Sequence, residues 1–197
     1  MTKLIIQYHI RSFLLRFKIS KQRLLYLGFG AAAFLIAYSA GAAAPMGEEE
    51  AETLRREFSR QIEGIDQNGI FLNNVRIALV MFVPAAGVAF GAFSGFATGS
   101  IFSALAASSP MLNEVPPLAI LITPFGIMEV FVYALAMSRS GMLIYYLFKR
   151  RPWSKYAIPT LIELSIAAGV LFAAAVIEWQ MIEQIGGLDK SIAVEPV

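Results

Sequence analysis

Long apolar runs, separated by short polar stretches, make up most of this 197-residue chain. The runs occupy 24–44, 72–107, 118–148 and 157–179. No ionisable side chain occurs from Ile77 to Asn113. A transmembrane helix needs about 20 predominantly apolar residues in a row, which is more than a buried helix of a water-soluble domain usually contains. The pattern therefore predicts an all-α fold, a polytopic transmembrane helical bundle of about five membrane segments with broken or short helices.

The second run is too long for one crossing. A straight helix over 72–107 would measure about 54 Å, against a hydrocarbon core of about 30 Å. Small residues cluster at 91–95, where we expect the chain to break into a span at about 72–92 and a shorter one at about 96–109. Residues 96–123 either cross completely or form a re-entrant hairpin, and the pattern leaves both open.

The third run is interrupted by Pro124 and Gly126. Proline has no N–H to donate within a helix, and its ring collides with the preceding turn. We therefore expect a short dipping segment before Pro124 and a complete span that begins near Phe125. The last span is expected at 157–179, and an extracytoplasmic tail at 181–197 follows it.

A long acidic segment, 45–70, separates the first two runs. Its apolar residues recur at helical spacing, at Leu54, Phe58, Ile62 and Ile65. The segment is either an amphipathic helix resting on the outer membrane surface or on the other helices, or a solvated charged helix. Residues 1–23 are basic, and they either lie as an amphipathic helix on the cytoplasmic leaflet or form a frayed segment.

The charges predict an orientation in the membrane. Basic residues collect in 1–23 and 149–155, whereas acids dominate 45–70. Because Lys and Arg mark the cytoplasmic side, the N-terminus is expected inside and the C-terminus outside. We expect a retained first span at 24–44 rather than a cleaved signal peptide, and a core of four further membrane segments at 71–180. The expected location is the cell membrane, as a multi-pass protein.

The composition excludes several kinds of chemistry. Hydrophobic residues form 57% of the chain and charged residues 15%, proportions that fit a lipid-embedded protein. The chain has no cysteine and a single histidine, His9, which excludes disulfides, thiolate chemistry and a histidine metal cluster. The net charge of +2 gives no indication of nucleic-acid binding. Neither a nucleophile with its base nor a phosphate loop is found, so we expect a non-enzyme with no catalytic residues, metal, cofactor or identified small-molecule substrate.

Glycine recurs every four residues at Gly87, Gly91, Gly95 and Gly99. On a helix this spacing places all four on one face, which we call the glycine ladder. Such a face lets another helix approach closely, so that dispersion and Cα–H contacts hold the pair together. We expect a packing seam rather than a pore lining.

Polar side chains inside a membrane are costly, so they are candidates for function. They are Asn73, Asn74, Arg76, Glu129, Arg139 and Glu163. Glu129 is either an ion or proton site beside broken helices or a carboxylate that caps the first turn of its own helix. Arg76 is a candidate partner of Glu129, and Arg139 is a candidate partner of Glu163.

Several motifs follow one another in a recognisable order. They are Phe71-Leu-Asn-Asn, the glycine-rich span, Ser94-Gly95-x-x-x-Gly99, Thr123-Pro-Phe-Gly-Ile-Met-Glu129 and Ser140-Gly141. Together they resemble the stage II sporulation protein M family of integral membrane proteins over about 70–179. The Pro-x-Gly-Ile-x-Glu run is the most specific part. Family members typically have His where this chain has Phe125, a departure that weakens any proton relay transferred from the family, and often Asn-Gly where it has Ser94-Gly95.

The resemblance implies a multi-span, non-enzymatic membrane protein. In spore formers the sporulation member acts with a membrane-anchored peptidoglycan-degrading machine during engulfment, as a scaffold or localiser, but the family is much wider and we do not predict sporulation. We expect a scaffold or accessory subunit that packs through the glycine ladder with itself, as a homo-oligomer, or with other membrane proteins in the lipid bilayer. The alternative is a small transporter or channel component with an ion or proton site near Glu129.

Overall fold

The computed structural model describes residues 21–108, 116–152 and 156–192. Every regular element within these ranges is a helix, which confirms the predicted all-α class. The elements are α2 (Lys21–Ala42), α3 (Glu48–Ile62), α4 (Gln67–Met81), α5 (Ala86–Ser108), the 3-10 helix η1 (Pro117–Ile122), α6 (Pro124–Phe148) and α7 (Ala157–Ile192). Most of the basic segment expected at 1–23 lies outside the described residues.

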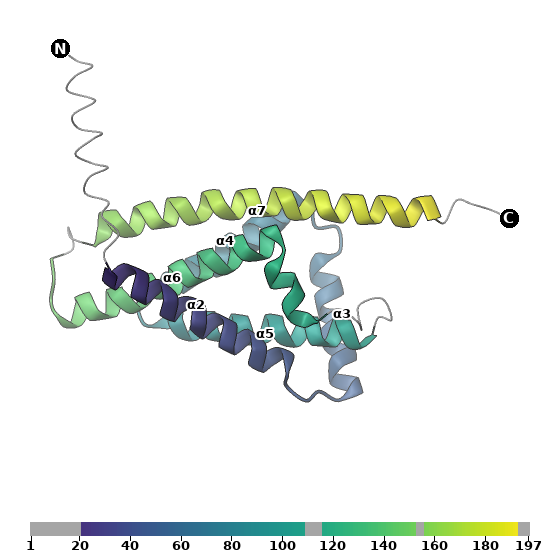
Figure 1. Cartoon of the computed structure of the whole chain (residues 1–197), viewed down its shortest axis with the longest axis horizontal. Coiled ribbons are helices and arrows are strands. Elements are labelled where there is room, and N and C mark those ends of the chain that lie inside the picture. Colours follow the sequence, from purple (N-terminus) through teal and green to yellow (C-terminus); the bar gives the residue numbers. More distant parts are fainter. Residues whose placement is uncertain (1–20, 109–115, 153–155, 193–197) are drawn as a thin grey trace, which may run out of the picture.

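Among the described residues, four helices are long and apolar enough to cross a membrane. Their qualifying stretches are Lys21–Ala42, Ala86–Ala107, Pro124–Phe148 and Ala157–Gln184. The fifth lengthwise helix, α4, has 15 residues and is about 22 Å long, shorter than a full crossing. Figure 1 shows α2, α4, α5, α6 and α7 running back and forth along the molecule, each in the opposite direction to the one before it. The chain therefore passes five times along the bundle, in agreement with the prediction.

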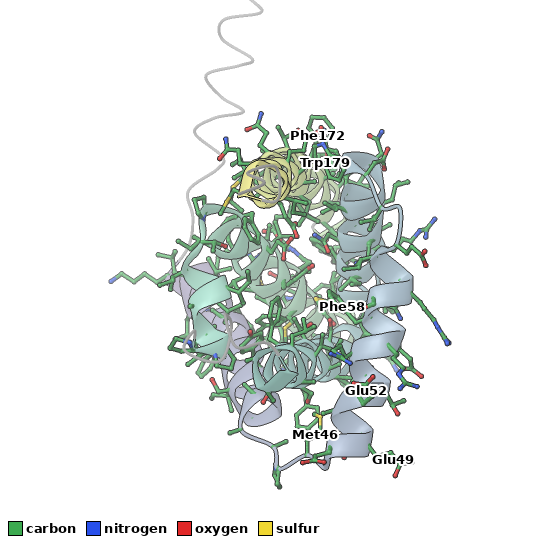
Figure 2. All side chains as sticks on the ribbon, turned by 90° about the vertical axis from the view of Figure 1, so that its right-hand side faces the viewer. Met46, Glu49, Glu52, Phe58, Phe172 and Trp179 are labelled. Atoms are coloured by element: carbon green, nitrogen blue, oxygen red, sulfur yellow. The ribbon has the colours of Figure 1, made fainter. Side chains whose placement is uncertain are left out.

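The two ends of the bundle differ in charge. Lys21 at the start of α2 and Lys149 after α6 lie at one end, which we call the basic end. At the other end, the acidic end, α3 lies across the direction of the lengthwise helices (Figure 1). Figure 2 shows Phe58 on the side of α3 that faces the bundle and Glu49 on the opposite side. On the exposed side, hydrogen bonds from Arg55 and Arg56 lower the pKa of Glu52.

The helix break predicted at 91–95 is wrong. Helix α5 runs unbroken through these glycines, and the chain breaks about ten residues earlier, between α4 and α5. Pro84 has no N–H for the helix ladder, and Ala85 adopts a left-handed conformation with φ of 66°. Inside a membrane, a run of small residues keeps its backbone hydrogen bonds, so glycine does not end a helix there as proline does. Helix α5 is long and apolar enough to cross a membrane alone, and residues 96–108 continue it without turning back.

The break predicted before α6 is present. The short η1 ends at Ile122, and Pro124 occupies the first turn of α6. Thr123 caps the helix, because its Oγ1 accepts a hydrogen bond from Gly126 N at 3.1 Å and donates one to Ile120 O at 2.6 Å. A Cβ atom on Gly126 would lie 2.2 Å from Ile120 O, so only glycine allows η1 to fold back this closely.

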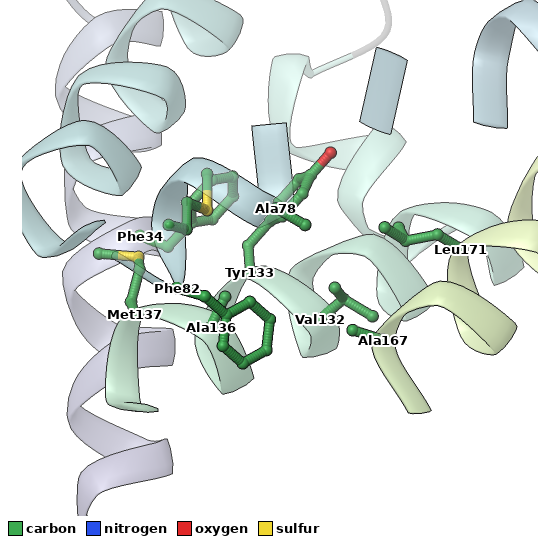
Figure 3. Packing of buried hydrophobic residues seen from close by; sticks show 10 residues of the cluster. Phe34, Ala78, Phe82, Val132, Tyr133, Ala136, Met137, Ala167 and Leu171 are labelled. Atoms are coloured by element: carbon green, nitrogen blue, oxygen red, sulfur yellow. The ribbon is translucent and has the colours of Figure 1, made fainter. Parts of the chain in front are cut away.

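The core lies along α6, which has more buried side chains than its neighbours. Val132, Tyr133 and Met137 of α6 contact residues from α2, α4 and α7 (Figure 3). The rings of Phe34 and Tyr133 lie 5.4 Å apart between centroids. Helix α7 packs along the same core and continues past Trp179, the predicted end of the last span, to Ile192. Most of the tail expected at 181–197 is therefore part of this helix.

Candidate functional site

The C-terminal half of the glycine ladder contacts the backbone of α2. A Cβ atom on Gly99 would lie 2.1 Å from Tyr38 O, and one on Gly95 would lie 3.0 Å from Phe34 O. The same holds from the other side, because a Cβ atom on Gly41 of α2 would lie 2.0 Å from Phe96 O. Since residues 34 and 38 meet 95 and 99 in the same order, α2 and α5 are parallel and touch backbone to backbone.

The N-terminal half of the ladder contacts α6 and the break before α5. A Cβ atom on Gly91 would lie 2.5 Å from the Sδ atom of Met137, and one on Gly87 would lie 1.9 Å from Met81 O. Ser140 of α6 closes this region by donating a hydrogen bond to Val83 O at 2.6 Å. Within one molecule the ladder is therefore covered by the chain's own helices.

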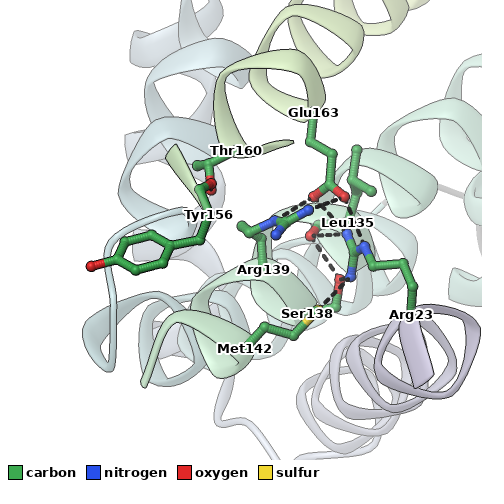
Figure 4. Close-up of polar contacts among 8 residues, drawn as sticks. All are labelled: Arg23, Leu135, Ser138, Arg139, Met142, Tyr156, Thr160 and Glu163. Carbon is green, nitrogen blue, oxygen red and sulfur yellow. Dashed lines mark hydrogen bonds and ion pairs between the residues drawn. The ribbon is translucent and has the colours of Figure 1, made fainter. Parts of the chain in front are cut away.

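An ion-pair cluster joins α2, α6 and α7 toward the basic end (Figure 4). The guanidinium of Arg139 forms a two-point contact with the carboxylate of Glu163, with an Nε–Oε2 distance of 2.8 Å and a second bond from Nη2 to Oε1. Arg23 approaches the same carboxylate and donates from Nε and Nη2, both at 2.7 Å. The arginine and glutamate that the sequence suggested as partners do pair.

Arg23 is the member of this cluster that sequence reasoning missed. Its Nη1 donates to Ser138 Oγ at 2.6 Å, and its Nη2 donates to Leu135 O at 3.3 Å. Because Arg23 precedes the first apolar run, the sequence places it in the basic cytoplasmic segment 1–23. A long arginine side chain at the start of a span can, however, reach along the helix to a buried acid. The one sequence feature that could have indicated this contact is Glu163, an acid within the last apolar span.

A second polar cluster lies between α4 and α6, nearer the acidic end. Asn74 Nδ2 donates to Glu129 Oε1 at 2.5 Å, and Asn73 Nδ2 is 3.5 Å from Asn74 Oδ1. Glu178 of α7 is close enough to act electrostatically on Glu129. Three of the predicted intramembrane residues thus come together here.

Two expectations for this cluster are wrong. Glu129 does not cap α6, because it is the sixth residue of that helix and Thr123 caps the first turn instead. Nor does it pair with Arg76. In the part of the chain that the structure describes, that arginine forms no hydrogen bond or ion pair. The Arg76 side chain lies on the other face of α4, toward α3.

The arrangement is suited to holding helices together. Across the described residues, no group of three His, Asp or Glu side chains is placed to hold a metal ion. The buried polar side chains there have hydrogen-bond partners. In a bilayer such contacts are expected to fix helix positions, since lipid offers these groups no alternative partner.

Comparison with known proteins agrees with this architecture. The model of the family described as Stage II sporulation protein M matches residues 24–179, which extend from α2 into α7. The matched region includes the whole glycine ladder, the cluster of Asn73, Asn74 and Glu129, and two members of the ion-pair cluster, Arg139 and Glu163, whereas Arg23 lies one residue before it. No curated protein and no solved structure matches the chain.

Proposed function

Because the chain belongs to the Stage II sporulation protein M family, we propose that it acts as a non-enzymatic membrane scaffold or accessory subunit. The observation that carries the proposal is the ion-pair cluster of Arg23, Arg139 and Glu163. Its charged groups contact one another and fix three helices, which suits a rigid framework rather than a reacting site. We place the protein in the cell membrane with its basic end inside, as the charge distribution predicts.

The surface that meets a partner is proposed to be α3. The glycine ladder is covered by α2 and α6, so its contribution is to pack the chain on itself, and a homo-oligomer or hetero-complex would use other faces. Helix α3 has no buried residue, and its exposed side carries acids such as Glu49 and Glu57. A charged face at the bundle end is accessible to a protein that projects from the membrane.

The test compares one surface variant with one internal variant of the full chain, purified in mild detergent with its complex held by chemical crosslinking. Glu57→Lys reverses a charge on the exposed side of α3, and we expect it to abolish a discrete crosslinked complex. Glu129→Gln is the control, because it replaces the buried acid with an isosteric amide. Loss of the complex in the Glu129→Gln variant, with the Glu57→Lys variant unaffected, contradicts the proposal.

One observation favours the alternative of a transporter or channel component. Glu129 is an acid within a membrane helix, next to an amide and electrostatically coupled to a second acid, Glu178. If this cluster moves protons, proteoliposomes containing the wild-type chain will dissipate a pH gradient measured with an internal pH-sensitive dye. In that case the Glu129→Gln variant will be inactive while the Glu57→Lys variant keeps wild-type flux.

A further inference from the structure

An open groove of about 270 Å³ lies between α3 and α4 at the acidic end. One wall is a stripe of α3 with Ile65 just beyond its end, and the other is a stripe of α4 at helical spacing. The residues that define it for the argument are Phe58, Ile62 and Ile65 on one side and Leu72, Asn73 and Arg76 on the other. Gly69 allows the two walls to meet closely, since a Cβ atom there would lie 2.6 Å from Ile65 Cγ1.

The groove joins a cation to an apolar wall. Arg76 is exposed, and no partner for its guanidinium exists in the described ranges 21–108, 116–152 and 156–192. Ile62 and Leu72 are 43% and 48% exposed, so the apolar side of the groove also has no protein cover there. The side-chain amide of Asn73 adds a hydrogen-bond donor beside the arginine.

The position of Arg76 along α4 decides which anion suits it. It lies nine residues after the helix start at Gln67, or about 14 Å along the axis, within the depth of one leaflet. Side chains on a helix tilt toward its N-terminus, which for α4 is the acidic end near the membrane surface. A guanidinium at this depth must reach an anion or water, and the phosphate groups of lipids lie on that side.

We propose that this groove binds one phospholipid of the leaflet at the acidic end. Arg76 and Asn73 hold the phosphate, and an acyl chain lies along Ile62 and Leu72. The guanidinium suits a phosphate because its N–H groups form paired charge-assisted hydrogen bonds. The apolar wall favours a lipid over a free phosphate ion, which would leave that wall in contact with water. The bound lipid would fix the angle of α3, the surface proposed above for partners.

The experiment is native mass spectrometry of the full chain released from nanodiscs that contain phosphatidylglycerol. We expect the wild type to retain one lipid, and Arg76→Gln to weaken retention about tenfold or more, the usual effect of losing a charge-assisted hydrogen bond. Arg60→Gln is the matched control, because Arg60 is an exposed cation of α3 outside the groove. Ile62→Ser removes an apolar side chain from the wall of the groove without changing the charge, and it should also reduce retention of the lipid.

Folding is monitored by helix content and melting temperature, and Ile62→Ser keeps the test valid if Arg76→Gln does not fold. The Arg76→Lys variant keeps the positive charge but cannot form the paired hydrogen bonds of a guanidinium. Lipid retention between that of the wild type and that of the Arg76→Gln variant therefore supports the proposal. Equal retention by the Arg76→Gln and Arg60→Gln variants overturns it. Displacement of the lipid by millimolar inorganic phosphate also overturns it, because the site would then take a free anion.

Discussion

Glu163 joins two arginines from two other helices, Arg23 of α2 and Arg139 of α6. Its carboxylate accepts hydrogen bonds from Arg139 and from Arg23, and its side chain is only 13% exposed. Two guanidinium groups share this one carboxylate, so an excess positive charge remains beside α6. The acid therefore compensates the charge of more than one arginine. Removing one partner from a buried ion pair costs more than the pair itself contributes, since the other charge is left in a poor solvent.

We predict that Glu163→Gln lowers the free energy of unfolding by about 3–5 kcal/mol. The amide cannot neutralise either arginine, although it keeps the size of the side chain. The measurement is unfolding of the purified chain in mixed detergent micelles, followed by helix content. Glu57→Gln is the control, because that acid is exposed on α3. Equal stability of the two variants contradicts a structural role for the cluster.

At the scale of elements, the closest contact joins the parallel helices α2 and α5. Glycine on both helices removes the side chains that would hold the backbones apart, and Ser100 Oγ donates across the seam to Gly41 O at 3.2 Å. The four-residue glycine spacing therefore predicted a close contact, but it identified neither the partner helix nor the fact that this partner belongs to the same chain.

Gly99→Ala is expected to destabilise the chain by about 1–3 kcal/mol, the usual cost of overpacking a close-packed contact. The new methyl group would lie 2.1 Å from Tyr38 O, a backbone atom that cannot move without displacing α2. Gly28→Ala and Gly169→Ala serve as controls, since a Cβ atom at either position meets nothing within 4 Å. Thermal unfolding in detergent compares the three variants. A Gly99→Ala midpoint matching the controls shows that α2 and α5 are not in contact.

At the scale of the whole molecule, the sequence predicted the helical class, the five passes and the polarity of the two ends. These follow from the length of apolar runs and from charge, which a bilayer constrains strongly. The position of one break did not follow, because small residues at 91–95 keep their helical hydrogen bonds in α5 whereas Pro84 has no N–H to donate. The role of Arg23 was also missed, because contacts between residues far apart in sequence leave no local pattern.

The orientation can be tested with single cysteines, because the natural chain has none. We expect Glu49→Cys at the acidic end to react with a membrane-impermeant maleimide in intact cells. Arg150→Cys at the basic end should react only after the cells are permeabilised. The measurement is the labelled fraction of each variant on a gel. The reverse accessibility would show that the bundle is inverted, and equal labelling of both would show that these ends do not lie on opposite sides.

The distance in sequence between Arg23 and Glu163 has a consequence for biosynthesis. The two residues are 140 positions apart. At a synthesis rate of about 5–20 residues per second, roughly 7–30 seconds pass between the synthesis of Arg23 and that of Glu163. Helix α2 can therefore reach its final position in the bundle only after α7 has been made, and the contact between these two residues is expected to form late in membrane insertion.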